Sequence, residues 1–177
     1  MARYSLPTKH KQTHHTKRLT MAIIGIDNGV TGAVAVLASE GSLLKQMPVT
    51  KSLDYTKKVK YVSRVNYYEL FTFLSSLEGR AYLERPMVNP GRFAATASAL
   101  RAFEATLIAL EQSGISYQFI DSKEWQKELL PSGLKGPQLK EASLLKAIQL
   151  FPHLEKEIRK QKDGDALLIA EYARLKL

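Results

Sequence analysis

The stretch Met21-Ala-Ile-Ile-Gly-Ile-Asp27 is a run of apolar residues that ends in a single acid. Its length and composition predict a buried β-strand. The residues that follow, Asn28-Gly-Val-Thr-Gly32, contain the Asn-Gly pair and the second glycine that favour a tight turn into a second strand over Ala33–Ala38. A further glycine-containing turn leads to a third strand over Ser42–Val49. This part of the chain therefore predicts a three-stranded meander, with Asp27 at the end of its first strand.

The rest of the chain predicts helices and strands in alternation. Residues 50–65 are polar and basic, which predicts an exposed connection. Apolar spacing, turn residues and capping residues predict the later elements as Tyr67–Leu77 (helix), Arg80–Glu84 (strand), Phe93–Gln112 (helix), Ile115–Ile120 (strand), a short helix capped by Ser122, a loop over Pro131–Gln138, a helix over Leu139–Leu150 and a last helix from Asp163 to Leu175. We therefore expect an α/β fold, in which helices flank a mixed five-stranded sheet.

The composition limits the kind of protein. A length of 177 residues and a hydrophobic fraction of 45% predict a single folded domain over residues 21–177. Residues 1–20 carry five basic residues and no acid, which indicates a basic flexible arm or an organellar transit peptide. The expected location is the cytoplasm, or the host cytoplasm for a phage protein, or an organelle if residues 1–20 are a transit peptide. No stretch approaches the roughly 20 uninterrupted apolar residues of a membrane span, so we expect no membrane association.

The charge and the cysteine count narrow the chemistry further. The formal net charge is +9, of which residues 1–20 contribute +5 and the remainder +4. Such a balance favours a polyanionic partner such as nucleic acid, although solubility alone is the simpler explanation. The chain has no cysteine, which excludes disulfides and thiolate metal sites. Any metal would therefore bind to oxygen or imidazole, a preference that suits a hard cation such as Mg²⁺.

Four acids stand where such a cation could be held. Asp27 and Glu84 each end an apolar strand, and Asp163 and Asp165 open the last helix. Carboxylates at strand ends and at a helix start can converge at one edge of a sheet, where divalent cations would neutralise them. Two Mg²⁺ ions about 4 Å apart would then suit phosphodiester hydrolysis, and Mn²⁺ favours the same ligands. Asp27 is the best candidate to bridge both ions.

Each acid also has a simpler explanation. Asp27 could be a turn residue, and Asp163 and Asp165 could cap the helix N-terminus. Glu84 is harder to explain, because Arg85 beside it is expected to point to the opposite face of the strand. Asp27 and the turn after it also resemble the phosphate-binding hairpin of actin-like ATPases and sugar kinases. Those proteins need two domains around the nucleotide, and 177 residues scarcely provide them.

Four motifs follow one another in an order that is more specific than any of them alone. They are Ile24-Gly-Ile-Asp-Asn-Gly-Val-Thr-Gly-Ala33, then Tyr82-Leu-Glu-Arg-Pro86, then Trp125 and Lys127 followed by Ala142-Ser-Leu-Leu-Lys-Ala-Ile-Gln-Leu-Phe-Pro152, and finally Asp163-Gly-Asp-Ala-Leu-Leu-Ile-Ala-Glu-Tyr172. In this order they resemble the RuvC-type Holliday junction resolvases of the ribonuclease H-like superfamily, most of all the phage and chloroplast branch.

The resemblance implies which acids are catalytic. Asp27, Glu84 and Asp165 match the positions of the family's metal-binding acids. The family usually has an Asp or His one helical turn before its final Asp, where this chain has Lys162. We assign Asp163 as the fourth catalytic, metal-binding acid, and Lys162 could instead contact the phosphate.

The resemblance also implies a homodimer, because a four-way junction needs two symmetric cuts. Small residues on one side of the Phe93–Gln112 helix would let a partner helix approach, while its Leu and Phe residues would cover the sheet. The alternative is a helix buried wholly within one subunit. Met87 matches an aromatic position that is thought to wedge into the junction centre, or it could belong to the core.

The expected function is that of a Mg²⁺-dependent endonuclease that resolves four-way junction DNA by paired symmetric nicks, leaving 5′-phosphate ends. The alternatives are a related nuclease for other branched DNA or RNA, and a non-catalytic junction-binding protein. The expected DNA-binding residues are Lys57, Lys58, Lys60, Arg64, Met87, Lys123, Lys127, Lys135 and Lys140.

Overall fold

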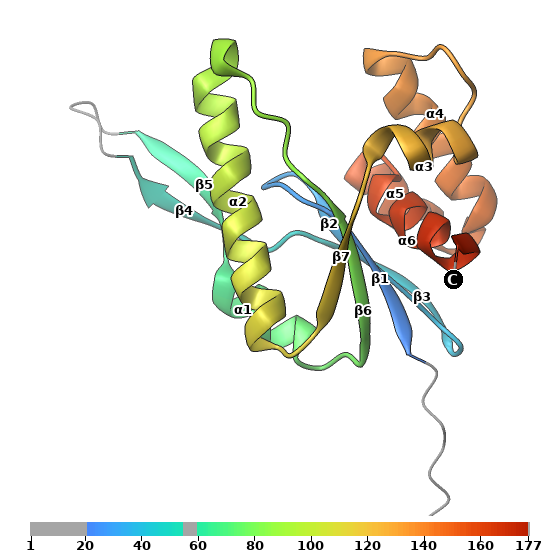
Figure 1. Ribbon diagram of the computed structural model, residues 1–177, viewed down its shortest axis with the longest axis horizontal. Coiled ribbons are helices and arrows are strands. Elements are labelled where there is room, and N and C mark those ends of the chain that lie inside the picture. Colours follow the sequence, from blue (N-terminus) through green and yellow to red (C-terminus); the bar gives the residue numbers. More distant parts are fainter. Residues whose placement is uncertain (1–20, 55–59, 177) are drawn as a thin grey trace, which may run out of the picture.

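The structure, a computed structural model, describes residues 21–54 and 60–176. Its centre is a five-stranded sheet in the order β3-β2-β1-β6-β7 (Figure 1). The strands are β1 (Ala22–Asp27), β2 (Ala33–Ala38), β3 (Gly41–Gln46), β6 (Gly79–Glu84) and β7 (Ser116–Ile120). The first three pair antiparallel, whereas β6 runs parallel to β1 and β7 runs parallel to β6. The expected α/β fold with a mixed five-stranded sheet is confirmed.

Helices cover both faces of this sheet. On one face lie α1 (Tyr67–Leu74) and α2 (Phe93–Gln112); on the other lie α3 (Ser122–Leu129), α4 (Gly136–Leu150), α5 (Glu155–Gln161) and α6 (Asp165–Lys176). Two short 3₁₀ turns, Pro90–Arg92 and Pro152–Leu154, precede α2 and α5. Side chains alternate between the two cores along each strand, as the pleat requires. On β1, for example, Ile24 and Ile26 face α1 and α2.

Gly25 explains how closely α6 approaches β1. A Cβ atom at Gly25 would lie 2.2 Å from the carbonyl oxygen of Ala166 and 2.6 Å from the nitrogen of Ala170, both in α6. Gly164 fits against α4 in the same way, because a Cβ there would lie 2.6 Å from the Ser143 carbonyl oxygen. These two glycines let the start of α6 sit directly over the first strand.

A second sheet replaces the connection expected over residues 50–65, and that expectation was wrong. The chain forms β4 (Val49–Leu53) and β5 (Tyr61–Val65), which pair with each other as a two-stranded ribbon. Most side chains of the ribbon are exposed, so the sequence lacks the clear apolar alternation of a half-buried strand, while Val65 is buried and anchors its base. The ribbon extends away from the main sheet beside α2 (Figure 1).

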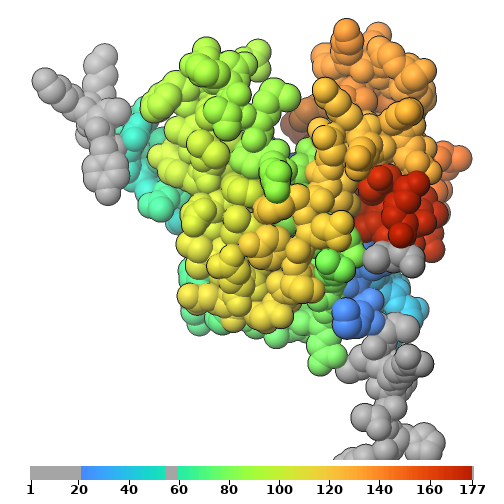
Figure 2. All heavy atoms as spheres, in the orientation of Figure 1, coloured from blue at the N-terminus to red at the C-terminus, as the bar shows by residue number. Residues whose placement is uncertain are grey.

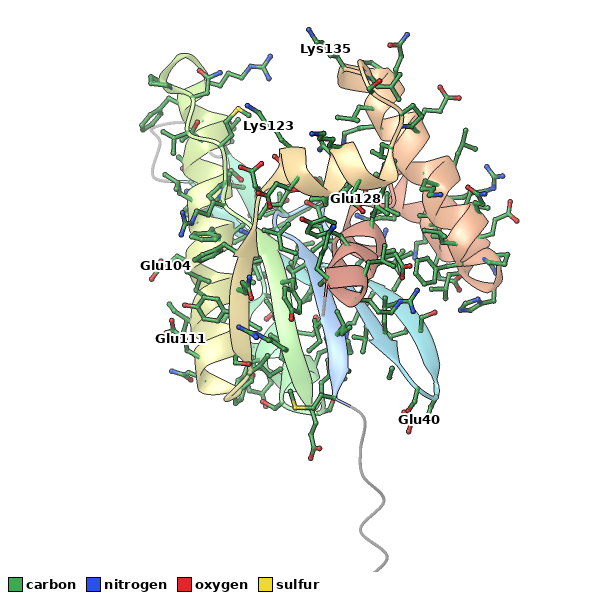
Figure 3. All side chains as sticks on the ribbon, turned by 45° about the vertical axis from the view of Figure 1, so that its right-hand side comes forward. Glu40, Glu104, Glu111, Lys123, Glu128 and Lys135 are labelled. Carbon is green, nitrogen blue, oxygen red and sulfur yellow. The ribbon has the colours of Figure 1, made fainter. Side chains whose placement is uncertain are left out.

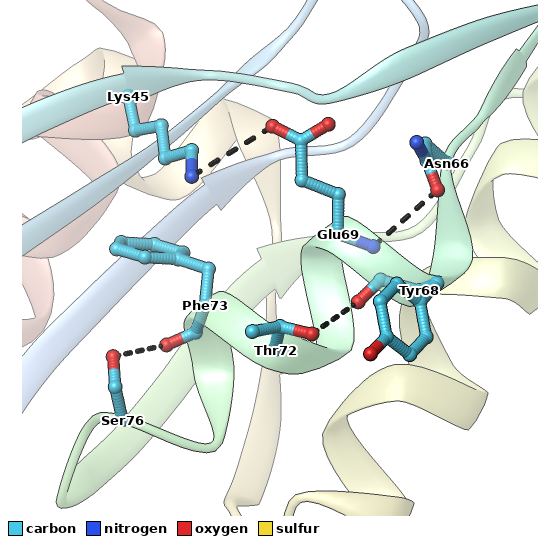
Figure 4. A network of polar contacts seen from close by, with 7 residues as sticks. All are labelled: Lys45, Asn66, Tyr68, Glu69, Thr72, Phe73 and Ser76. Carbon is cyan, nitrogen blue, oxygen red and sulfur yellow. Dashed lines mark hydrogen bonds and ion pairs between the residues drawn. The ribbon is translucent and has the colours of Figure 1, made fainter.

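The start of α1 is fixed by polar contacts, which Figure 4 shows. The side chain of Asn66 accepts a hydrogen bond from the Glu69 backbone nitrogen at 3.3 Å and caps the helix. Lys45 of β3 pairs with Glu69 at 3.9 Å, and its ammonium lies 4.5 Å from the centre of the Phe73 ring. The helix ends at Leu74 rather than at the expected Leu77, and Ser76 donates its hydroxyl to the Phe73 carbonyl oxygen at 2.7 Å.

The orientation of α2 corrects another expectation. The helix has the expected bounds, but its small residues Ala102, Thr106 and Ala109 are buried within the subunit, and Leu100 is 43% exposed. The small side chains let α2 approach α1 and the sheet closely. Of the larger residues expected to cover the sheet, Leu110 is fully buried and Phe103 and Leu107 pack against the same core, so only Leu100 departs from the expectation. By length and composition alone the helix Pro90–Gln112 could cross a membrane, which is weak evidence by itself.

Several other element boundaries differ from the expectation; the last helix, for example, begins at Asp165 rather than at Asp163. Asp121 rather than Ser122 caps α3, because its side chain accepts a hydrogen bond from the Lys123 nitrogen at 2.7 Å. α4 begins at Gly136 rather than at Leu139, since a proline is well tolerated in a first helical turn. β3 ends at Gln46, and Val49 already belongs to the ribbon.

Candidate active site

The topology brings the ends of two neighbouring strands and the start of a helix to one edge of the sheet. β1 and β6 are adjacent and parallel, so Asp27 and Glu84 lie at the same edge. Their side chains belong to the face on which α3 and α6 pack, because the alternate residues Ile26 and Leu83 face the other core. Asp165, the first residue of α6, completes this arrangement above β1.

All four acids have raised pKa values, with burial as the largest cause and repulsion between the acids as a further cause for three of them. Burial, followed by repulsion from Asp165, Asp163 and Glu84, raises the pKa of Asp27 from 3.8 to about 7. Burial and Asp165 raise the pKa of Asp163 from 3.8 to about 6, although Lys140 opposes the rise. Burial also raises the pKa of Glu84 and that of Asp165. The structure therefore brings the four predicted acids together as a mutually repelling group.

Neighbouring helices supply one partner to each of three acids. The indole nitrogen of Trp125 in α3 donates to Oε1 of Glu84, and the hydroxyl of Ser143 in α4 donates to Oδ1 of Asp165. The ammonium of Lys140, also in α4, lies 3.8 Å from Oδ2 of Asp163. Oδ1 of Asp163 is buried without a hydrogen-bond partner.

The donor set fits a hard divalent cation. All four candidate ligands are carboxylates, the unpaired buried oxygen of Asp163 needs a partner, and a cation would remove the repulsion that raises these pKa values. Within residues 21–54 and 60–176, no three acidic or histidine side chains already form a ligand set for one ion. Mg²⁺ usually takes only one or two carboxylates and completes its shell with water and substrate phosphate, so pairs of these acids suffice.

The turn between β1 and β2 is held tightly next to Asp27. A Cβ atom at Gly32 would lie 2.0 Å from the Asp27 carbonyl oxygen, so only glycine fits there. From α5, Gln161 donates its side-chain amide to the Thr31 carbonyl oxygen at 2.7 Å. From α2, the hydroxyl of Thr106 donates to the side-chain oxygen of Asn28 at 2.8 Å. Helices on both faces of the sheet therefore fix the backbone that carries Asp27.

A cleft of about 350 Å³ opens beside these acids, between the ends of β1 and β6 and the start of α2. Its lining includes Asp27, Glu84, Asn28, Arg85, Met87, Asn89 and Arg92. Figure 2 shows that the surface is hollowed at this edge, between the green N-terminal half of α2 and the orange α3 and α4. Arg85 lies over the Phe119 ring at 4.5 Å, on the face of the strand opposite to Glu84, as expected. Met87 is 83% exposed and does not belong to the core.

The predicted basic residues are spread around this edge, and two of them, Lys57 and Lys58, lie outside the described residues. Lys60 and Arg64 are exposed on the ribbon. Lys123 and Lys127 are exposed on α3, and Lys135 is exposed where α4 begins (Figure 3). Of the described members, only Lys140 pairs with one of the four acids.

Sequence reasoning gave no site role to several residues around the acids, although Trp125 and Ser143 lie within the motifs quoted above. Asp121 adds its charge to the repulsion on Glu84, and Trp125, Ser143 and Gln161 contact the acids or the turn beside them. A buried acid needs partners, but nothing in the local sequence indicates which distant helix supplies them. Lys162 is exposed and ends α5 with a φ of 71°, and it makes no contact with the acids among the contacts of the described residues.

Comparisons with known proteins support the fold. No protein-family model matches the sequence, and no curated protein matches it. Among solved structures, Thermus thermophilus RuvC in complex with a Holliday junction substrate matches with a TM-score of 0.51 at 15% identity, over 88% of this chain and 96% of that chain. A second structure of Thermus thermophilus RuvC gives a TM-score of 0.49 at 15% identity, over 88% of this chain and 97% of that chain. At this level of identity the likeness concerns architecture, and the chain has a RuvC-like fold of the ribonuclease H type.

Proposed function

We propose that the protein is a metal-dependent endonuclease that resolves four-way DNA junctions by paired nicks. The observation that carries the proposal is the group of Asp27, Glu84, Asp163 and Asp165, which burial and charge repulsion within the group leave with raised pKa values at one sheet edge. Such a group is unfavourable without cations and repels phosphate, whereas with cations it attracts phosphate. The RuvC-like fold and the net charge of +9 favour DNA as the substrate.

The site residues divide the chemical work. Asp27, Glu84, Asp163 and Asp165 would hold two Mg²⁺ or Mn²⁺ ions, and Asp27, at the end of the central strand β1, would help to hold both. When bound, the ions supply an activated water and stabilise the leaving oxygen. Arg85 and Arg92 line the adjacent cleft and would bind phosphates on either side of the cut. Trp125 is almost fully buried beside the acids and keeps bulk water from that side of the site.

The wider DNA contact would use the exposed cations around the catalytic edge. Asp27 at the end of β1 pairs with Ala33 of β2, and Ala33 pairs with Gln46 at the end of β3. The chain therefore leaves the main sheet for the ribbon at the same edge as the acids. This route puts Lys60 and Arg64 on an arm that starts from the catalytic edge. Lys123, Lys127, Lys135 and Lys140 would contact phosphates on the α3 and α4 side, and exposed Met87 would reach the junction centre.

We also propose a homodimer that uses the outer face of α2. Phe93 is 79% exposed, Leu100 43% and Ile108 38%. These exposed apolar side chains, with Glu104 between Leu100 and Ile108, lie on one side of the helix, which is suited to a second copy of the chain. A pair of subunits would place two cleavage sites on one junction. Membership of the phage and chloroplast branch stays a prediction from the sequence motifs.

The test is cleavage of a synthetic mobile four-way junction in Mg²⁺, beside a linear duplex of the same sequence. Asp27→Asn and a chelator should each abolish cleavage, while Glu40→Gln, which removes an exposed acid from the turn between β2 and β3 at the far end of these strands (Figure 3), should leave it unchanged. Symmetric nicks on the junction only would support the proposal. Tight binding without cleavage would favour a non-catalytic junction-binding protein, and equal cleavage of the duplex would refute the choice of substrate.

A further inference from the structure

We propose that Trp125 and Ser143 are positioning residues of the carboxylate site, each holding one oxygen of an acid so that the other oxygen remains available to a cation. This inference rests on the proposed function. It concerns two residues that touch neither DNA nor metal and that would act through Glu84 and Asp165.

The contact of Trp125 with Glu84 joins two elements that are far apart in sequence. Trp125 is 1% exposed in the middle of α3, and its ring belongs to the core beneath the site. An indole nitrogen can only donate, and a buried one normally finds an acceptor. Here the acceptor is Oε1 of Glu84, at the end of β6. The bond fixes the direction of the carboxylate, because the large indole ring cannot turn within the core.

Ser143 makes the matching contact from α4. Its side chain is 1% exposed and donates to Oδ1 of Asp165, while its oxygen accepts the Gly164 backbone N–H at 3.2 Å. Gly164 has no room for a Cβ atom against the Ser143 carbonyl and Ala147, so α4 and the start of α6 are locked together. The hydroxyl therefore holds both the side chain of Asp165 and the backbone just before it.

Asp27 differs from these two acids in a way that supports the assignment. Throughout the described part of the chain, no side chain or backbone donor makes a hydrogen bond to the Asp27 carboxylate. Both of its oxygens remain available, as a ligand that bridges two ions requires. Glu84 and Asp165 keep one oxygen each, as ligands of a single ion require.

Partners of this kind orient metal ligands, and their loss typically lowers metal affinity or activity about 10–100-fold. A merely structural contribution of Trp125 or Ser143 predicts a different result. It would lower the stability of the protein with and without metal by the same amount, and the concentration of metal needed for half-saturation would not change.

The experiment is a titration of the intact protein with MnCl₂, followed by calorimetry and by thermal unfolding. Trp125→Phe and Ser143→Ala should each raise the dissociation constant about 10–100-fold. Ser143→Thr retains the hydroxyl and should restore most of the affinity. Thr72→Ala removes a helical hydroxyl that bonds only the Tyr68 carbonyl in α1, and it should leave metal binding unchanged (Figure 4).

A spectroscopic measurement addresses Trp125 directly. It is the only tryptophan of the chain, so indole fluorescence reports on this contact alone. MnCl₂ should change its emission in the wild type and in Thr72→Ala, and the change in Ser143→Ala should require more metal. A wild type that binds no Mn²⁺ by calorimetry would overturn the metal site of the proposed function itself. Normal binding by the wild type, with unchanged dissociation constants in Trp125→Phe and Ser143→Ala, would overturn only the positioning assignment.

Discussion

Replacement of Asp27 by asparagine should stabilise the metal-free protein while abolishing its activity. The wild-type carboxylate has a pKa of about 7 in the folded protein, against 3.8 as the ordinary value. One pKa unit corresponds to about 1.4 kcal/mol, so the ionised carboxylate destabilises the fold at pH 8 by up to about 4 kcal/mol. Relaxation of neighbouring side chains reduces this figure, and we expect a gain of about 2–4 kcal/mol for Asp27→Asn.

The pH dependence has a definite sign. The pKa of Asp27 is raised on folding, so the folded state binds the proton more tightly than the unfolded state does. The wild type should therefore be most stable relative to Asp27→Asn near pH 4 and lose that advantage as the pH rises to about 7. Asp163, whose pKa is about 6, is present in both proteins, so its titration lowers the stability of both over a similar pH range and largely cancels from the difference. Above pH 8 the difference should be constant.

The assay is urea denaturation in a chelating buffer at pH 5 and at pH 8, with thermal unfolding as a second probe. At pH 8 the midpoint of Asp27→Asn should lie about 5–15 °C above that of the wild type. Mg²⁺ at 100 times its dissociation constant should then stabilise the wild type by about 2.7 kcal/mol and the variant far less. A variant that is less stable than the wild type at pH 8 without metal, or a difference that does not change with pH, would refute the electrostatic reasoning.

Three further predictions concern other parts of the molecule. Gly25→Ala should lower the free energy of unfolding by about 1–3 kcal/mol or more, because its Cβ would meet the backbone of α6. Gly29→Ala is the control, since a Cβ there meets nothing within 4 Å, and it should change the free energy of unfolding little. Chemical denaturation of both variants measures the difference. Combined replacement of Lys60 and Arg64 by glutamine should weaken junction binding and reduce the slope of log K against log salt concentration by up to about 2. Replacement of the two lysines of α5 is the control and should leave this slope unchanged. An unchanged slope in the ribbon variant would exclude the ribbon from the DNA interface. Leu100→Glu should convert a dimer to a monomer in sedimentation analysis, and a wild type that is already monomeric would contradict the proposed dimer.

The elements that the sequence predicted well are those with long, regular apolar patterns. The helix Phe93–Gln112 is long and periodic and ends before Gly114, so its bounds agree with the structure. The ribbon β4–β5 was missed because its strands are short and mostly exposed, and the pairing rather than burial defines them. The buried face of α2 was predicted in part: Phe103, Leu107 and Leu110 pack on the core as expected, whereas Ala102 and Ala109 are buried as well because close packing on α1 favours small residues.

The candidate site could be predicted in its acids but not in their surroundings. Asp27 and Glu84 are visible in the sequence because each ends an apolar run, and parallel neighbouring strands bring such ends together. From the local sequence alone, Trp125 reads as a core aromatic residue and Ser143 as an ordinary helical serine, with nothing to indicate a contact with the acids. Their contacts depend on how α3 and α4 lie over α6, which is a tertiary property that no local pattern encodes.

The packing of α6 on β1 has a consequence for the order of folding. Asp27 and Asp165 come from the first strand and the last helix of the described chain, so the site exists only as a long-range contact. Closing so large a loop is entropically costly, and contacts of this range generally form late. An unfinished chain would therefore carry Asp27 and Glu84 on neighbouring strands of the sheet without being able to cut. Local detachment of α6 from β1, where it packs on Gly25, would likewise inactivate the fully folded protein while most of its sheet stays intact.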